Sequence, residues 1–324
     1  MAVVLLLLLV TKAGRASRRR KSPEAVRLVG VSCLGSAPLM VYTNAMLADP
    51  LPPTLARQVA LVTGGARRVG KAIAIELARR GARVAIHANS SIDEANELGA
   101  LLQERYGTDV GAFQAELTDE GVAEDLVHRV ARHFACTGDA CDEHAGALDI
   151  LINCAAIWPE TPFEDFGAED VRKCLDVNTV APLLLAKHAG LWMAGQESGG
   201  VIINLGDAAT GPDGKPYRDY PAYHPSKAAI PGMTRMLAVE LSRRNKRVRV
   251  NAVLPGPVIC QHLPGEPEEP EERKDHARYQ AMIRTDDLGG YGKAEHVAHA
   301  VAMLVENPFM TGVVLPVDGG GRLR

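Results

Sequence analysis

Tyr223 and Lys227 are the two residues whose types and spacing most directly suggest chemistry. They stand four positions apart in YHPSK, at the start of a predicted helix, so their side chains share one helix face. An ammonium beside a phenol favours the phenolate, and we expect Lys227 to lower the pKa of Tyr223 from about 10 toward neutrality. Tyr223 would then serve as a general acid toward a carbonyl or an imine. An ordinary helix surface is the alternative interpretation, because this spacing is common.

A glycine-rich turn lies earlier in the chain. The segment TGGARRVG contains Gly64 and Gly70, follows an expected strand and opens an expected helix. Glycine lets the backbone approach a pyrophosphate, and the free N–H groups of a helix N-terminus bind its negative charge. This order of elements predicts a dinucleotide site, and a tight turn without a ligand is the alternative.

The residues around this turn favour NADPH over NADH. Where a carboxylate would bind the ribose 2′-hydroxyl of NADH, the sequence has Asn89, Ser90 and Ser91. Arg67 and Arg68 in the turn offer guanidinium groups that suit a 2′-phosphate, and the serines can donate hydrogen bonds to it. The alternative is that both arginines are solvated on the surface of the turn.

These residues need a scaffold, and the chain predicts one by alternating short apolar runs with longer helical patterns, as in βαβ units around a parallel sheet. Strands are expected at 58–63, 83–87, 110–114, 148–153, 200–204, 247–253 and 312–316, and helices at 69–80, 91–106, 119–135, 168–194, 221–243 and 293–305. The helix with Tyr223 follows the fifth strand, at the carboxyl edge of the sheet, where such sheets bind ligands. Residues 136–147 and 265–275 are expected to be loops.

Composition excludes several classes of protein. The 324 residues are 47% hydrophobic and 23% charged with a formal net charge of -3, which argues against nucleic acid or an anionic membrane as partner. The six cysteines lack paired metal-ligand spacing; Cys136, Cys141 and His144 are assigned to a loop, and no metal is expected.

Residues 1–54 are expected to form a poorly ordered extension before a single domain at 55–324. The apolar run at 2–10 is about half the roughly 20 residues that a membrane-spanning helix needs, and its basic residues follow it rather than precede it. We therefore expect neither a membrane anchor nor secretion, and a cytoplasmic location.

Five segments together resemble short-chain dehydrogenases/reductases over residues 55–324: TGGARRVG, NCAA at 153–156, VNTVAP, YHPSK, and PGPV at 255–258. The resemblance implies an α/β fold, a three-layer doubly wound parallel sheet of the Rossmann type, in a single domain. It implies that Asn178 completes a proton relay with Tyr223 and Lys227, and that Lys227 also holds the nicotinamide ribose. It further implies a homotetramer, and cofactor contacts from Asn153, Ala155, Pro255 and Gly256.

One departure from the family pattern bears on the substrate. Most members have a serine after the fifth strand, but this chain has Asp207. An ionised carboxylate only accepts hydrogen bonds and suits a substrate with N–H donors, such as a pterin ring. The pteridine reductase branch is similar here: it has an aspartate at this place, an arginine matching Arg68, and an aromatic residue, matched by Trp158, that stacks on the pterin. Alternatively, Asp207 caps a turn and Trp158 packs a loop.

Two further differences from that branch concern the pocket. Ala156 stands in place of a substrate-contacting serine, and the interval from Asp207 to Tyr223 is longer than the resemblance implies, with 211–220 as the inserted loop. The sequence still predicts an NADPH-dependent reductase of a small pterin- or dihydrofolate-like molecule. A carbonyl reductase of the 3-oxoacyl carrier-protein reductase type is the close alternative, and a non-catalytic dinucleotide sensor is the alternative from another class.

Overall fold

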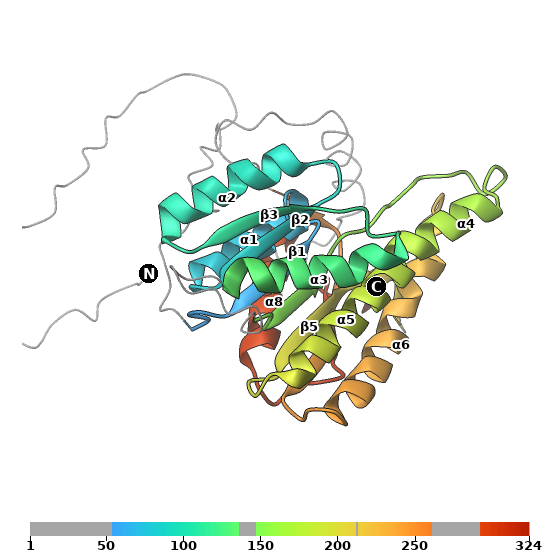
Figure 1. Ribbon diagram of the computed structural model, residues 1–324. Helices are drawn as coiled ribbons and strands as arrows, with labels where there is room; N and C mark the ends of the chain where they lie inside the picture. Colours follow the sequence, from blue (N-terminus) through green and yellow to red (C-terminus); the bar gives the residue numbers. More distant parts are fainter. Residues whose placement is uncertain (1–53, 136–146, 212, 261–291, 324) are drawn as a thin grey trace, which may run out of the picture. The chain divides into compact units, whose positions relative to one another are not determined.

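A seven-stranded parallel sheet is the centre of the fold in this computed structural model, which describes residues 54–135, 147–211, 213–260 and 292–323 (Figure 1). The strands are β1 (Val59–Thr63), β2 (Arg83–Ala88), β3 (Val110–Gln114), β4 (Ile150–Asn153), β5 (Gly200–Leu205), β6 (Val248–Pro255) and β9 (Val314–Val317). Their order is β3-β2-β1-β4-β5-β6-β9, so the order reverses between β1 and β4. Crevices at such reversals are where doubly wound sheets bind ligands.

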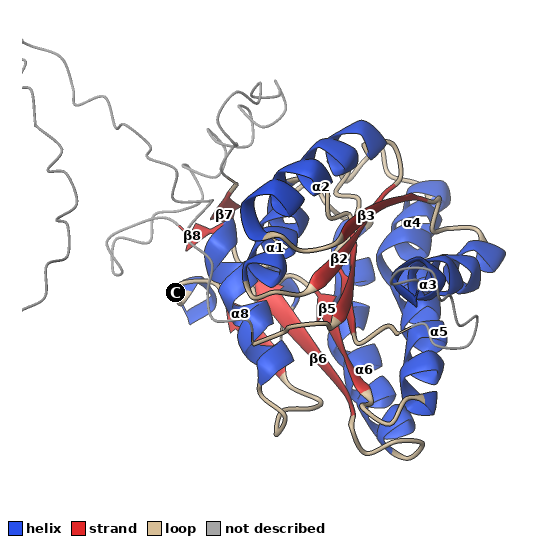
Figure 2. Ribbon diagram, turned by 60° about the vertical axis from the view of Figure 1, so that its left-hand side comes forward, coloured by secondary structure: helices blue, strands red, loops and turns tan. Residues whose placement is uncertain are grey.

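Helices cover both faces of the sheet (Figure 2). They are α1 (Arg68–Arg79), α2 (Ile92–Tyr106), α3 (Glu120–Ala135), α4 (Ala168–Leu175), α5 (Ala181–Gly195), α6 (Tyr223–Ser242) and α8 (Ala294–Glu306). Alternate residues of β1 point to opposite faces: Ala60 and Val62 pack with α1, α2 and α8, whereas Val59 and Leu61 pack with α3, α5 and α6. Burial on both faces explains why the strands are almost wholly apolar.

The register of the sheet aligns the strand ends that matter for the site. Thr63 at the end of β1 pairs with His87 of β2, and Asn153 at the end of β4 pairs with Asn204 of β5. The carboxyl ends of four neighbouring strands therefore meet at one edge. The seven predicted strands are confirmed, with boundaries that shift by no more than two residues.

The prediction of a single continuous helix at 168–194 is wrong in one respect. The structure has α4, then a π-helical turn at Asp176–Val180, then α5. Within this turn the amide of Asn178 bonds to the backbone of Ile157 and to Ser226, which accounts for the interruption. A second difference is a two-stranded parallel pair of β7 (Val258–Ile259) and β8 (Gly292–Lys293) that the sequence did not predict.

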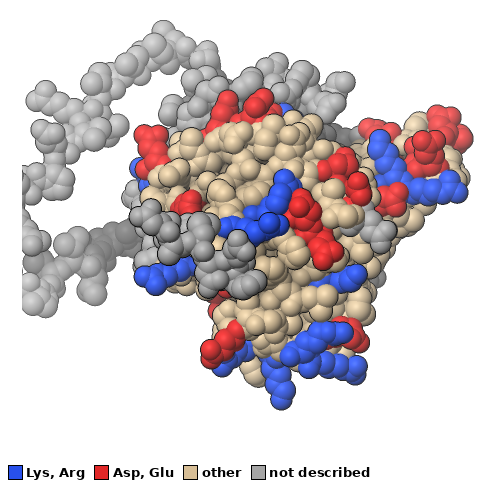
Figure 3. Space-filling model, in the orientation of Figure 1, with Lys and Arg blue, Asp and Glu red and all other residues tan. Residues whose placement is uncertain are grey.

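The predicted N-terminal extension lies outside the described residues except for Thr54, as do residues 136–146 and the acidic segment 265–275. On the face shown in Figure 3, basic and acidic side chains are interspersed. In the described ranges, no helix has both the length and the apolarity that crossing a bilayer requires.

Candidate active site

The glycine-rich turn packs closely against the end of β4. Gly64 has a φ of +61°, and a Cβ there would lie 3.0 Å from the Cα of Ala155. A Cβ on Gly70 would lie 2.1 Å from the carbonyl oxygen of Gly64, which no side chain permits. Thr63 joins the two strand ends, because its hydroxyl oxygen accepts from the N–H groups of Cys154 and Ala155, each at 3.0 Å. The turn is thus a backbone cradle at the reversal of strand order.

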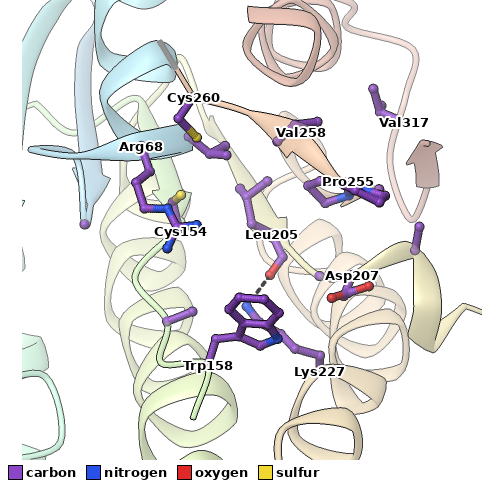
Figure 4. Close-up of a pocket in the computed structure, with 18 of the residues that line it drawn as sticks. Arg68, Cys154, Trp158, Leu205, Asp207, Lys227, Pro255, Val258, Cys260 and Val317 are labelled. Carbon is purple, nitrogen blue, oxygen red and sulfur yellow. Dashed lines mark hydrogen bonds between the residues drawn. The ribbon is translucent and has the colours of Figure 1, made fainter. Parts of the chain in front are cut away.

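A cavity of about 910 Å³ opens from this cradle (Figure 4). Its wall joins the glycine turn, the ends of β2, β4, β5 and β6, and the start of α6. The predicted site residues that line it are Gly64, Arg67, Arg68, Gly70, Asn89, Ser90, Ser91, Ala155, Trp158, Asp207, Tyr223, Lys227, Pro255 and Gly256. Residues spread over nearly two hundred positions are therefore brought to one cavity.

Asp207 and Tyr223 are hydrogen-bonded within this cavity. The Tyr223 hydroxyl donates to Oδ2 of Asp207 at 2.8 Å, and the Tyr217 hydroxyl donates to the same oxygen at 2.8 Å. The other oxygen, Oδ1, accepts from the backbone N–H of Ala209 at 2.7 Å, so Asp207 also caps the 3-10 turn Ala208–Thr210. Asp207 therefore caps a turn, which the sequence offered as the alternative to a role toward the substrate, and also contacts the phenol of Tyr223.

Lys227 lies beneath this pair and is only 4% exposed. Its ammonium donates to the carbonyl oxygen of Leu205 at 2.9 Å, the bond drawn as a dashed line in Figure 4. Burial lowers the pKa of Lys227 below its ordinary value. The helical spacing correctly predicts that Lys227 and Tyr223 line the same cavity.

The expected low pKa of Tyr223 is wrong for this arrangement. Burial, and then the charge of Asp207, raise the pKa of Tyr223 well above its ordinary value. The carboxylate accepts the phenol's proton in a hydrogen bond and would repel a phenolate, so it favours the neutral form. Tyr223 is therefore held as a protonated phenol, the state in which it can donate a proton.

Trp158 lines the cavity in the segment after β4 (Figure 4). Its ring stacks on Tyr220, with the ring centres 4.6 Å apart and the planes 7° from parallel. Its indole N–H donates to the Tyr217 hydroxyl at 3.2 Å. Stacking and the hydrogen bond fix the plane of the indole while it remains part of the cavity wall.

Comparison with known proteins identifies the family. The model of the family described as Enoyl-(Acyl carrier protein) reductase matches residues 64–321. An uncharacterized oxidoreductase of Thermotoga maritima is 35% identical over 268 residues, 81% of this chain and 96% of the relative, and human 3-oxoacyl-[acyl-carrier-protein] reductase is 32% identical over 266 residues, 82% and 98%. A Burkholderia cenocepacia short chain dehydrogenase in complex with NADP is 32% identical, with a TM-score of 0.68 over 83% of this chain and 99% of that one. The chain belongs to the short-chain dehydrogenase/reductase family.

This short-chain dehydrogenase/reductase is an NADP-dependent oxidoreductase, and its cavity fits the phosphorylated cofactor. The close-packed glycine turn supplies the backbone approach that a pyrophosphate needs. Beside it, Asn89, Ser90 and Ser91 line the cavity where a carboxylate would repel a 2′-phosphate. Arg67 lines the same wall and pairs with Glu94, which places its guanidinium at the rim.

Asn153 and Asn178 have structural contacts in this short-chain dehydrogenase/reductase. Neither is among the described residues that line the cavity. Asn153 is 4% exposed, and its amide donates to the carbonyl of Pro182 and to the side chain of Asn204, linking β4 to β5 and α5. Asn178 is wholly buried against Ile157 and Ser226. Their predicted contact with the cofactor and role in proton relay remain predictions.

Sequence reasoning missed several residues that line the cavity, and also the support behind the glycine turn. Among the missed lining residues, Tyr217 lies in the segment 211–220, which was expected only to be an inserted loop that shapes the mouth of the pocket. His87 lies behind the glycine turn, where its Nδ1 accepts from the N–H of Gly64 at 3.3 Å and its Nε2 faces the carbonyl oxygen of Ala115 at 3.1 Å. Alternation of residues in β2 gives no sign of either bond of His87.

We expect His87 to make the stability of the protein fall in acid. Burial lowers its pKa, so near and below its ordinary value of about 6.5 the unfolded chain binds a proton that the folded chain excludes. Neutral His87 contributes its full share of the folding stability above its ordinary pKa, and this share is lost as the pH falls below it. The loss arises because a protonated Nδ1 would point its own N–H at the N–H of Gly64. Urea unfolding between about pH 7.5 and 5.5 should show a smaller acid loss for His87→Asn than for the wild type. Equal losses would contradict this role.

Proposed function

We propose that this protein is an NADPH-dependent reductase of a pterin- or dihydrofolate-like ring. The observation that supports it is the carboxylate of Asp207, which lines the cavity and shares a hydrogen bond with the proton donor Tyr223. A carboxylate accepts hydrogen bonds and would repel the alkoxide that forms from a carbonyl, whereas pterins present N–H donors beside the C=N bond to be reduced. The site therefore suits a ring with N–H groups better than a simple ketone.

Proton transfer in this proposal belongs to Tyr223. When bound, NADPH would supply a hydride for the ring carbon of a C=N bond, and the adjacent nitrogen would then need a proton. Tyr223, held as a neutral phenol, gives its proton to that nitrogen, so the C=N bond becomes CH–NH. Asp207 orients the ring by accepting from one ring N–H at the acceptor position that Tyr217, Tyr223 and Ala209 do not use. Trp158 offers a fixed aromatic wall against which the ring packs.

Arg68 gives a second line of support, because its backbone is strained. Its φ is +52°, a left-handed conformation that costs an arginine about 1 kcal/mol and a glycine almost nothing. Its side chain points into the cavity beside Cys154 (Figure 4). The conformational cost of an arginine at this position is explained if its guanidinium binds an anionic or hydrogen-bond-accepting group of the cofactor or the substrate.

Replacement of Arg68 by glycine therefore separates stability from activity. We expect Arg68→Gly to leave the free energy of unfolding unchanged or to raise it by up to about 1 kcal/mol, because the strain is removed. We expect kcat/KM to fall about tenfold or more, because a charge-assisted hydrogen bond is lost. Urea denaturation and steady-state kinetics measure the two effects. A variant that is less stable and equally active would contradict both statements.

The second candidate function is reduction of a carbonyl, as in 3-oxoacyl carrier-protein reductases. It is favoured by one observation, the 32% identity to the human protein of that name over 98% of its length. In that reaction Tyr223 would protonate the alkoxide, and the carboxylate of Asp207 beside Tyr223 is the feature that argues against it.

One assay compares the two candidates. Purified protein is mixed with NADPH and either biopterin or an acetoacetyl thioester, and oxidation is followed at the absorbance band of the reduced nicotinamide. We expect oxidation with biopterin and little with the thioester. Oxidation with the thioester alone would remove the pterin assignment and leave the carbonyl reductase.

A further inference from the structure

Tyr217 connects the residues that surround the reacting groups. Its hydroxyl donates to Oδ2 of Asp207 at 2.8 Å and accepts from the indole N–H of Trp158 at 3.2 Å. Tyr223 donates to that same carboxylate oxygen. The result is one hydrogen-bonded chain that runs from Trp158 through Tyr217 and Asp207 to the proton donor Tyr223.

The position of Tyr217 is fixed independently of this chain. Its ring packs on His224 with the ring centres 4.4 Å apart, and His224 Nε2 lies 3.3 Å from the backbone nitrogen and 3.2 Å from the backbone oxygen of Tyr217. Burial, and then the charge of Asp207, raise the pKa of Tyr217, so its hydroxyl stays protonated as a donor. Tyr217 thus presents an O–H group of fixed position to Asp207.

Proton transfer from Tyr223 gives a function to the second hydrogen-bond donor that contacts the carboxylate of Asp207. When Tyr223 gives up its proton, its phenolate oxygen faces a carboxylate oxygen that was 2.8 Å away in the hydrogen bond. Two like charges at this separation repel strongly in a buried site, and a remaining O–H donor offsets the repulsion. Tyr217 is placed to be that donor, because its hydroxyl already binds the same oxygen.

We infer that Tyr217 is a positioning residue for the reduction, which holds Asp207 toward Tyr223, stabilises the pair as the proton leaves, and fixes the plane of Trp158. The inference rests on the proposed function in that it assigns proton transfer to Tyr223 beside Asp207. It adds that Tyr217 belongs to the catalytic arrangement, although the sequence placed it in a loop expected only to shape the mouth of the cavity.

The first test is Tyr217→Phe, which keeps the ring and removes the hydroxyl. We expect kcat to fall about tenfold or more, because a hydrogen bond to a charged group is lost, while NADPH affinity is unchanged. Tyr106→Phe is the matched control, since Tyr106 ends α2 and is not among the described residues that line the cavity. An unchanged kcat, or a loss confined to KM, would overturn the inference.

A double-mutant cycle tests whether Tyr217 acts through Asp207. If it does, the loss in Tyr217→Phe with Asp207→Asn should be smaller than the product of the two single losses, because the contact with Asp207 is already lost and only the effect through Trp158 remains. Losses that multiply would show that Tyr217 acts independently, and would overturn the inference. The same cycle measured by urea unfolding gives a coupling free energy without any turnover, and a value of zero would contradict the contact.

A spectroscopic readout reports the Trp158 end of the chain. The protein has two tryptophans, so Trp192→Phe leaves Trp158 as the single tryptophan, which is excited selectively at wavelengths that tyrosine does not absorb. On this background we expect Tyr217→Phe to change the emission of Trp158, because the indole N–H loses its acceptor, and Tyr106→Phe to leave it unchanged. Unchanged emission after Tyr217→Phe would show that the hydrogen bond is absent in solution.

Failure of the inference and failure of the proposed function give different results. Every variant is assayed with both biopterin and the acetoacetyl thioester. A wild-type protein that reduces only the thioester removes the pterin assignment, and Tyr217→Phe is then judged by its kcat on the thioester. A wild-type protein that reduces biopterin together with an unaffected Tyr217→Phe removes only the role of Tyr217.

Discussion

Tyr223→Phe is expected to reduce turnover by about a thousandfold, within the usual range for removal of a general acid. The variant keeps the aromatic ring among Trp158, Tyr217 and Tyr220 and loses only the hydroxyl that donates to Asp207. Because hydride transfer to a ring carbon leaves a basic nitrogen that needs a proton, both events slow down together. NADPH oxidation with the accepted substrate measures the loss.

NADPH binding is the internal control for this variant. Tyr223 belongs to α6, whereas the groups expected to hold the phosphates of NADPH belong to the glycine turn and to the residues after β2, so we expect the affinity for NADPH to persist. If Tyr223→Phe still binds NADPH but has lost its turnover, Tyr223 acts in catalysis rather than in cofactor binding. Unchanged activity of every kind in Tyr223→Phe would instead favour a non-catalytic dinucleotide sensor and contradict the catalytic account.

Asp207→Asn is expected to have the second largest effect. The variant keeps the shape of the side chain and its ability to cap the turn through Ala209, but it replaces one charged acceptor by a neutral amide. Pterin reduction should fall about 10- to 100-fold, which corresponds to about 1.5–3 kcal/mol for a hydrogen bond to a charged group. Steady-state kinetics with biopterin measure this loss.

Reduction of a carbonyl should respond to the same variant in the opposite direction. Without the carboxylate charge, the alkoxide that forms beside Tyr223 is no longer repelled, so any activity with the acetoacetyl thioester should be retained or rise. A parallel loss on both substrates would show that Asp207→Asn acts on the fold or on proton transfer alone. Urea unfolding of the variant distinguishes these two causes.

The sequence predicted the parts of the fold that local patterns determine. Buried parallel strands are short apolar runs, and the covering helices are longer amphipathic ones, so their alternation already indicated the doubly wound sheet. The glycine turn and the pair Tyr223 and Lys227 were found for the same reason, because each depends on spacing within one element. Residues of the glycine turn, Tyr223 and Lys227 line the cavity in the structure.

Features that depend on contacts between distant segments were missed. The π-helical turn around Asn178 depends on the backbone of Ile157, 21 positions away, and has no periodicity of its own. The raised pKa of Tyr223 depends on Asp207, 16 positions away, while the spacing pointed only to Lys227. Tyr217 lies in a segment without periodicity, where the type of a residue does not predict its contacts.

Transfer of deuterium tests the central claim most directly, namely that hydride passes to a ring carbon of a pterin while Tyr223 supplies the proton. The protein is incubated with biopterin and NADPH that carries deuterium at both C4 positions, and the products are analysed by mass spectrometry. The account predicts a reduced pterin with one deuterium on carbon for each C=N bond that is reduced, and its near absence in Tyr223→Phe. Unlabelled, unreduced pterin beside an acetoacetyl thioester that gains deuterium at its former carbonyl carbon would contradict the account.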